Sequence, residues 1–251
     1  MTQPGLERSL HPALIPPGPT NVGTVVVVSL EAPLRTAQWA GLLATLPYDY
    51  FVKVSGTGHI KDYVARRMPL PLPSKFESQL LMRTLRLNCL IREYAPLWEE
   101  LFDPAWLSED WTDPSPTQRP LNDIEPTWSM ATPLRTDFDR RKALVELDAL
   151  AALMLGLTAD QLCAMYRTQF AVLRKYEFNM VFDAHGRKIA KDHQTAGVRQ
   201  EKDDWKLVQE WIEAPGSVDL RIYEPPFFKP DREKEMRVAY EEFARRYPTG
   251  G

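Results

Sequence analysis

The polar side chains best placed to contact a ligand lie between residues 53 and 67. Ser55, Thr57 and His59 are separated by glycines, and glycine lets a backbone approach a phosphate group or a groove closely. The cations of this stretch are Lys53, Lys61, Arg66 and Arg67. Such side chains contact phosphates, which position a protein on its ligand without reading a sequence. The stretch therefore suits phosphate binding, and the alternative is an ordinary strand-to-helix connection with surface charges.

Charge is distributed unevenly around this stretch. Residues 49–92 hold eight Lys and Arg and three acids, a net charge of +5, whereas residues 93–139 hold two basic and eleven acidic side chains, a net charge of −9. The whole chain of 251 residues carries −3. A basic stretch beside an acidic one fits local contact with phosphates. The other interpretation is that both stretches form solvated faces.

The residues that usually build a catalytic or metal site are scattered. None of His11, His59, His185 and His193 stands at metal-ligand spacing from another. The two cysteines, Cys89 and Cys163, lie outside any Cys-x-x-Cys pair. The sequence also lacks a Gly-x-Ser-x-Gly elbow. We therefore expect no catalytic residue, no cofactor-binding residue and no metal site in this chain.

In the first half of the chain, short elements are expected between proline-rich connections. The valine-rich residues 22–30 and the alternating aromatic and polar residues 48–54 are typical of strands. Helices are expected over residues 36–46 and 60–68, and a long helix is expected after a capping box formed by Ser74 and Glu77. Residues 94–101 should continue as a helix. Residues 102–136, which are rich in Pro, Asp, Ser and Trp, are expected to form a surface excursion or a hinge.

The second half has clearer boundaries. A helix should begin at Asp137 or Asp139 and stop at Gly156, and Thr158 with Gln161 should cap a second helix that reaches about Tyr176. Residues 181–189 are typical of a β-hairpin, and residues 203–212 and 231–247 of helices. The buried-looking Glu146 and Asp148 are expected to form structural ion pairs.

Localisation is predicted from what the sequence lacks. There is no basic segment followed by an apolar one at the N-terminus, which argues against a signal peptide. No apolar run approaches the roughly 20 residues of a membrane span. We expect a cytoplasmic protein without membrane contact.

Three stretches that together cover most of the chain resemble one known family. They are Leu46-Pro-Tyr-Asp-Tyr-Phe-Val-Lys-Val-Ser-Gly-Thr-Gly-His59 with Arg67-Met-Pro-Leu-Pro71, Leu85-Arg-Leu-Asn-Cys-Leu90 with Tyr94-Ala-Pro-Leu-Trp-Glu-Glu-Leu101, and Asp139-Arg-Arg-Lys-Ala-Leu-Val-Glu-Leu-Asp-Ala-Leu150 with Tyr166-Arg-Thr-Gln-Phe170 and Leu173-Arg-Lys-Tyr-Glu177. The similarity is to the C-terminal target-recognition region of the large adenine-specific DNA methyltransferases of restriction–modification (type IIG-like) and phage-defence systems.

The resemblance implies double-stranded DNA as a partner, together with a methyltransferase catalytic domain or subunit that uses S-adenosylmethionine. It favours DNA contact for Lys53, Ser55, Thr57, His59, Lys61, Arg66 and Arg67. The catalytic part of this family carries a Gly-rich cofactor loop and an Asn/Asp-Pro-Pro-Tyr/Phe motif, whose aromatic residue stacks on a flipped adenine. Here Gly56-Thr-Gly58 is too short for the loop, and Glu224-Pro-Pro-Phe227 is the only similar motif.

Glu224 is one methylene longer than Asp, so its carboxylate would be displaced by about 1.5 Å. We interpret residues 224–227 as a turn stiffened by proline, after a strand over residues 218–223. The expected protein is α+β, with a strand-and-helix module (1–73), a long helix and acidic connection (74–136), and a helical hairpin with a small β element and terminal helix (137–251). Its predicted function is DNA target recognition without a catalytic domain. The alternative is a protein-interaction module that docks on a methyltransferase or nuclease subunit through its acidic, Trp-rich stretch.

Overall fold

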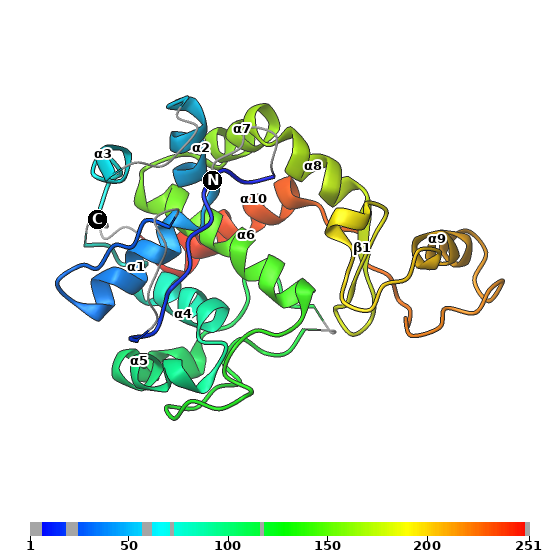
Figure 1. Ribbon diagram of the computed structural model, residues 1–251, viewed down its shortest axis with the longest axis horizontal. Helices are drawn as coiled ribbons and strands as arrows, with labels where there is room; N and C mark the ends of the chain where they lie inside the picture. The colour runs from blue at the N-terminus through cyan, green and yellow to red at the C-terminus, as the bar shows by residue number, and fades with distance from the viewer. Residues whose placement is uncertain (1–6, 19–24, 57–61, 71–72, 116–117, 249–251) are drawn as a thin grey trace.

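The computed structural model describes residues 7–18, 25–56, 62–70, 73–115 and 118–248. The fold is α+β and mainly helical, as predicted. Helix α6 (Asp137–Met154) lies at the centre and packs against α4 (Glu77–Asn88), α7 (Ala159–Gln169) and α10 (Arg232–Arg246), as Figure 1 shows. The two strands β1 (Met180–Phe182) and β2 (Lys188–Ala190) form an antiparallel hairpin in which Val181 is paired with Ile189.

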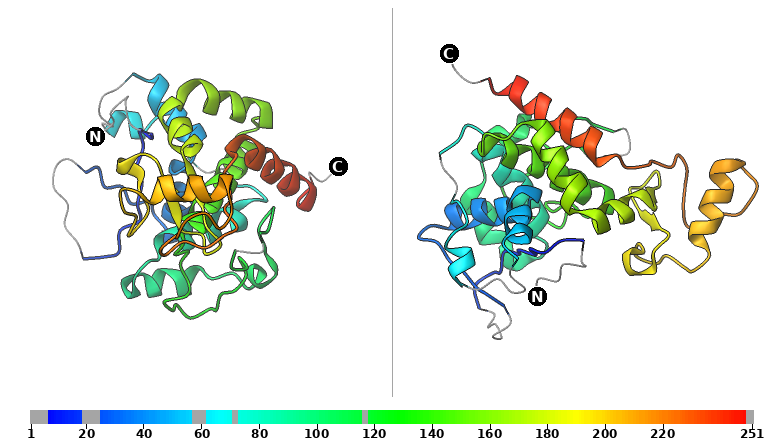
Figure 2. Two further views of the ribbon diagram at one scale, coloured as in Figure 1. Left: turned by 90° about the vertical axis from the view of Figure 1, so that its right-hand side faces the viewer. Right: turned by 90° about the horizontal axis from the view of Figure 1, so that it is seen from above.

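The other elements surround this centre. They are α1 (Pro33–Leu43), α2 (Leu46–Val54), α3 (Asp62–Ala65), η1 (Arg92–Tyr94), α5 (Ala95–Leu101), η2 (Pro104–Ser108), α8 (Ala171–Phe178), η3 (His193–Thr195) and α9 (Asp204–Glu213). The main core contains side chains from all three predicted segments, among them Leu42, Leu85 and Leu147. The hairpin and α9 project to one side of the helical body (Figures 1 and 2).

Local signals fix the ends of the central helices. The hydroxyl of Thr136 accepts a hydrogen bond from the backbone N–H of Asp139 at 3.1 Å and starts α6. The chain turns after α6 at Gly156, whose φ of +68° suits glycine. Thr158 and Gln161 form the predicted capping box of α7. That helix stops at Phe170, and α8 continues from there, so the predicted single helix is two.

Three predicted strands are wrong. Residues 48–54 belong to helix α2, because Pro47 lies in its first turn, where proline is tolerated. Tyr48 and Val52, four residues apart, are buried on one face of that helix. Residues 25–30 form no strand, and Val25 to Val28 are all exposed. Residues 218–223 also form no strand.

The segment 102–136 is not a surface excursion. The side chains of Trp106, Trp111 and Leu121 within it are each at most 1% exposed. The indole of Trp106 donates to the carbonyl oxygen of Ser78 at 3.1 Å, and that of Trp111 donates to the carbonyl oxygen of Arg119 at 2.9 Å. Burial of these large rings attaches the segment to α4 and α5.

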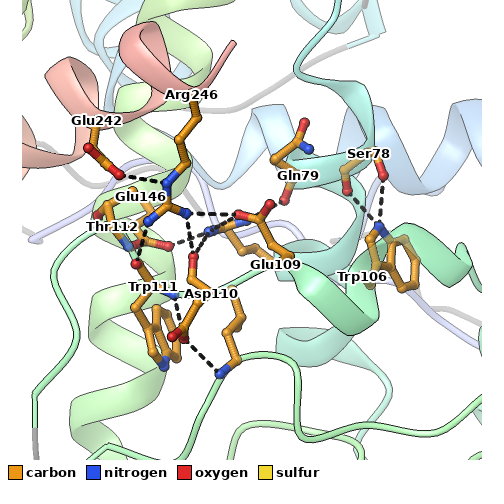
Figure 3. Close-up of polar contacts among 12 residues, drawn as sticks. Ser78, Gln79, Trp106, Glu109, Asp110, Trp111, Thr112, Glu146, Glu242 and Arg246 are labelled. Atoms are coloured by element: carbon orange, nitrogen blue, oxygen red, sulfur yellow. Dashed lines mark hydrogen bonds and ion pairs between the residues drawn. The ribbon is translucent and has the colours of Figure 1, made fainter.

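Buried charges reinforce this attachment (Figure 3). Arg83 of α4 is bound to Glu146 of α6 at 2.6 Å and to Glu109 at 3.0 Å, and all three are buried. Glu146 also accepts hydrogen bonds from the backbone and the hydroxyl of Thr112, both at 2.6 Å. Arg246 of α10 donates to the carbonyl oxygens of Asp110 and Trp111 at 2.8 Å. The prediction of a structural role for Glu146 is therefore confirmed.

Candidate nucleic-acid interface

The predicted phosphate-binding stretch is divided by the structure. Lys53 lies in the last turn of α2, with its ammonium 5.1 Å from the ring centre of Phe170, and the hydroxyl of Ser55 donates to the carbonyl oxygen of Val52 at 2.7 Å. Arg66 and Arg67 are exposed just after α3. Thr57, His59 and Lys61 lie outside the described residues. The structure therefore brings Lys53 against the junction of α7 and α8, where sequence reasoning placed no site for a ligand.

Part of the basic charge in residues 49–92 is internal. Arg83 and Arg86 are fully buried. Arg86 donates to the carbonyl oxygens of Thr132 at 2.9 Å and Leu121 at 2.6 Å. Burial lowers the pKa of Arg86 to about 10. These two arginines hold the core together, and they are not available to bind phosphates.

A second basic surface lies at the C-terminal end of α8. Residues 164–191 contain six Lys and Arg and two acids. An open cleft of about 770 Å³ lies there between α8 and the start of α10, and Arg174, Lys175, Phe178 and Lys229 line it. Asn179 also lines the cleft, and its carbonyl oxygen accepts a hydrogen bond from the backbone N–H of Lys191 at 2.9 Å. We call the set Arg174, Lys175, Phe178, Lys191 and Lys229 the Phe178 patch.

Three cations of this patch have no carboxylate partner among the described residues. Arg174 donates to the carbonyl oxygen of Arg167 at 3.0 Å, and Lys229 donates to that of Phe178. No ion pair is formed by Lys191 within the described part of the chain. Only Lys175 is paired, with Asp192 at 3.3 Å. Because no carboxylate neutralises these cations among the described residues, their positive charge attracts an external anion.

The ring of Phe178 lines the same cleft as Arg174, Lys175 and Lys229. Its side chain is 74% exposed, although the ammonium of Lys229 is 4.9 Å from the ring centre. Partial burial of its ammonium group lowers the pKa of Lys229. An exposed aromatic ring beside cations is the combination that proteins use to stack on bases and hold the neighbouring phosphates.

The floor of the cleft is a buried ionic network. Glu177 is bound by Arg232 at 2.9 Å and by Arg141 at 2.8 Å, and it accepts a hydrogen bond from the hydroxyl of Tyr166 at 2.7 Å. Burial raises the pKa of Glu177, but the charges of Arg232 and Arg141 outweigh it and lower this pKa to about 2.

Arg232 extends this network to α6. It is paired with Asp148 at 2.6 Å, and Asp148 also accepts a hydrogen bond from the backbone N–H of Leu46 at 2.7 Å. Both charges are buried, with Asp148 fully so. The expected structural ion pair of Asp148 is therefore confirmed, and the network joins α2, α6, α8 and α10 beneath the cleft.

The motif Glu224-Pro-Pro-Phe227 is used in packing. The side chain of Glu224 is 64% exposed and is paired with His185 at 3.0 Å, and its carbonyl oxygen accepts from the backbone of Ala184 at 2.8 Å. Phe227 packs edge-on against Trp211, with ring centres 5.5 Å apart. An aromatic ring held in this way is not presented for stacking on a flipped base.

Among the described residues, no group of three or more His, Cys, Asp and Glu side chains is arranged to hold a metal ion. The helices in this part of the chain are also too short or too polar to cross a membrane. No protein-family model, curated protein or solved structure matches this chain.

Sequence reasoning missed the Phe178 patch. The excess of cations in residues 164–191 was a signal for this patch. Residues 49–92 have a larger excess of cations, which favours them as the candidate site. The exposure of Phe178 had no such signal, because a phenylalanine at helical spacing from Arg174 and Lys175 is equally compatible with a buried face.

Proposed function

We propose that this chain is the DNA target-recognition part of an adenine-specific DNA methyltransferase of the restriction–modification type. In this proposal a separate catalytic domain or subunit binds S-adenosylmethionine and transfers the methyl group, in the cytoplasm. The resemblance of the three sequence stretches supports the proposal. The structural observation that carries it is the Phe178 patch, in which an exposed aromatic ring lies at the end of α8 with three cations, Arg174, Lys191 and Lys229, that have no carboxylate partner among the described residues.

The patch and the predicted stretch around Lys53 are compatible with one DNA surface. Lys53 and Arg8 lie over the ring of Phe170, at 5.1 and 6.0 Å from its centre, at the start of α8. Phe178 is the last residue of the same helix. A helix of eight residues is about 12 Å long, close to the width of the major groove. Lys53 near one end of α8 and the Phe178 patch at the other are therefore separated by a helix about as long as a groove is wide.

The decisive experiment measures binding of the purified chain to duplex DNA by fluorescence anisotropy between about 50 and 200 mM salt, a range over which binding to phosphates weakens steeply. The Arg174→Ala/Lys191→Ala/Lys229→Ala variant should bind more weakly. Its slope of log affinity against log salt should be shallower by about 0.9 for each phosphate that the variant no longer neutralises. The variant Lys53→Gln/Arg66→Gln/Arg67→Gln tests the predicted stretch in the same assay.

A matched control removes three exposed charges elsewhere, in Lys202→Ala/Lys206→Ala/Arg245→Ala. This control should keep most of the affinity and the full salt slope. An equal decrease of affinity in the control, or no binding of the parent chain to duplex DNA, contradicts the proposal. Methyl transfer by the purified chain alone, abolished by Glu224→Ala, would also contradict it and would make residues 224–227 catalytic.

A protein-interaction module is the second candidate, and one observation favours it. Val25, Val26, Val27 and Val28 are between 42% and 54% exposed. No described residue forms a main-chain hydrogen bond with Val26, Val27 or Val28. A partner's strand is able to pair with such a segment. This candidate predicts salt-insensitive binding to a methyltransferase or nuclease subunit, abolished in Val26→Lys/Val28→Lys, and no affinity for DNA.

A further inference from the structure

We propose that Phe178 is a wedge that inserts into the base stack of duplex DNA at an opened base-pair step. The inference rests on the proposed function, since it takes DNA as the partner of the Phe178 patch. It adds that the module deforms the DNA and recognises how easily a step opens. Apolar side chains that enter a base step partly unstack it and kink the duplex.

The first argument is that the chain on either side of Phe178 is held by contacts while its ring stays in solvent. Glu177 precedes it and is fixed by Arg141 and Arg232 at 2.8 and 2.9 Å. The ammonium of Lys229 donates to the carbonyl oxygen of Phe178. Since these contacts hold the backbone at Phe178, little backbone freedom remains to be given up when the ring inserts.

The second argument is the placement of the cations. Arg174 lies one helical turn before Phe178. Asn179, the residue after Phe178, accepts a hydrogen bond from the backbone of Lys191. The ammonium of Lys229 lies 4.9 Å from the centre of the Phe178 ring. A wedge needs cations that bind phosphates on both sides of the step it enters, because their attraction offsets the cost of unstacking. Isolated exposed apolar residues are common, but this one has the ammonium of Lys229 over its ring and shares its cleft with Arg174 and Lys175.

An abasic site provides a test that separates insertion from charge. A missing base leaves a gap in the stack, so a wedge enters it without the unstacking cost. The parent chain should therefore bind a duplex with one central abasic site about tenfold more tightly than the intact duplex of the same length and sequence. Phe178→Ala should reduce this ratio to about one, and Phe178→Trp should preserve it. Arg174→Ala should weaken binding to both duplexes and leave the ratio unchanged.

The matched control is Val198→Ala, since Val198 is another exposed apolar residue, at 82%; it should keep the tenfold ratio. Circular-dichroism melting verifies that all variants remain folded. The wedge is overturned if the chain binds duplex DNA with salt dependence but does not prefer the abasic duplex. It is also overturned if that preference remains in Phe178→Ala. Either result leaves the proposed function standing. Absence of duplex binding overturns both. Competition by poly-glutamate as strong as that by DNA assigns the patch to an acidic protein and also overturns the wedge.

Discussion

Glu177 and Phe178 are consecutive in the chain, yet Glu177 is 5% exposed and Phe178 is 74% exposed. The carboxylate of Glu177 is bound by two buried arginines below the cleft, and the ring of Phe178 lies in solvent above it. The last turn of α8 thus joins the ionic core directly to the candidate interface. Substitutions of Glu177 are expected to change both the free energy of unfolding and the conformation of the Phe178 patch.

Replacement of Glu177 by Gln should strongly destabilise the fold. Arg141 and Arg232, both buried, would be deprived of a carboxylate that now accepts hydrogen bonds from each. Breaking a buried ion pair by removing one partner costs about 3–5 kcal/mol. Urea unfolding followed by circular dichroism measures this decrease. The control is Glu213→Gln at an exposed position, which should change the free energy of unfolding little; an equal effect would contradict the assignment.

The same side chain predicts a dependence of stability on pH. The pKa of Glu177 is lowered in the folded protein to about 2 from the ordinary 4.5. Its ionised form therefore stabilises the fold above pH 4.5, and this contribution disappears as the pH falls from about 4.5 through about 2. The difference corresponds to about 3 kcal/mol. The difference in the free energy of unfolding between the parent chain and Glu177→Gln should therefore decrease as the pH falls over this range. A difference that is constant with pH would refute the assignment.

Arg83→Met should release the segment 102–136. Without the guanidinium, Glu146 and Glu109 remain buried beside each other with no opposite charge from α4. We expect the free energy of unfolding to fall by about 3–5 kcal/mol, together with faster acrylamide quenching of Trp106 and Trp111. Arg245→Met, at a residue with a 72% exposed side chain, is the matched control. Unchanged quenching in Arg83→Met would show that the tryptophans alone hold the segment.

Gly41→Ala should destabilise the protein, although alanine is the better helix former. A Cβ atom at this position of α1 would lie 2.1 Å from the hydroxyl oxygen of Thr84 in α4. Overpacking of this kind costs about 1–3 kcal/mol. Thr84→Ala removes the clashing oxygen, so the double variant should recover part of the decrease in melting temperature. No recovery would mean that α1 and α4 separate instead.

Both cysteines should be unreactive in the native protein. Cys89 and Cys163 are fully buried, and burial raises the pKa of Cys89 to about 12. Because the thiolate is the reacting form, dithionitrobenzoate should label neither thiol at about pH 8, near the ordinary pKa of a thiol, on a timescale of minutes. Both thiols should react after denaturation. Rapid labelling of one native thiol would contradict the packing around that residue.

Local signals in the sequence predicted much of the helical second half. The hydroxyl of Thr136, the capping box of Thr158 and Gln161, and the turn at Gly156 act within a few residues, so they are legible without the fold. The boundaries of the hairpin and of α9 and α10 were predicted for the same reason. The structural ion pairs of Glu146 and Asp148 were inferred from charges on an apolar helix.

The secondary-structure predictions that were wrong concern segments whose conformation depends on contacts between distant residues. Tyr48–Val54 has strand-like composition, but Leu46 and Tyr48 are buried in a helix whose backbone is fixed by Asp148, 102 residues away from Leu46. Val25–Val28 has high strand propensity, but neither described strand pairs with it, because β1 and β2 pair with each other. Phe178 could not be identified from the sequence, because whether a helical residue is covered depends on what packs beside it.

The run Val25–Val28 has a consequence for handling the protein. Four consecutive valines, each between 42% and 54% exposed and without a charge or a proline among them, form a segment of high strand propensity. Identical segments from separate molecules are able to pair with one another, so concentrated solutions of the chain should aggregate through this segment. A physiological partner that covers these valines would therefore also act as a solubilising subunit, and co-expression with that partner should raise the soluble yield.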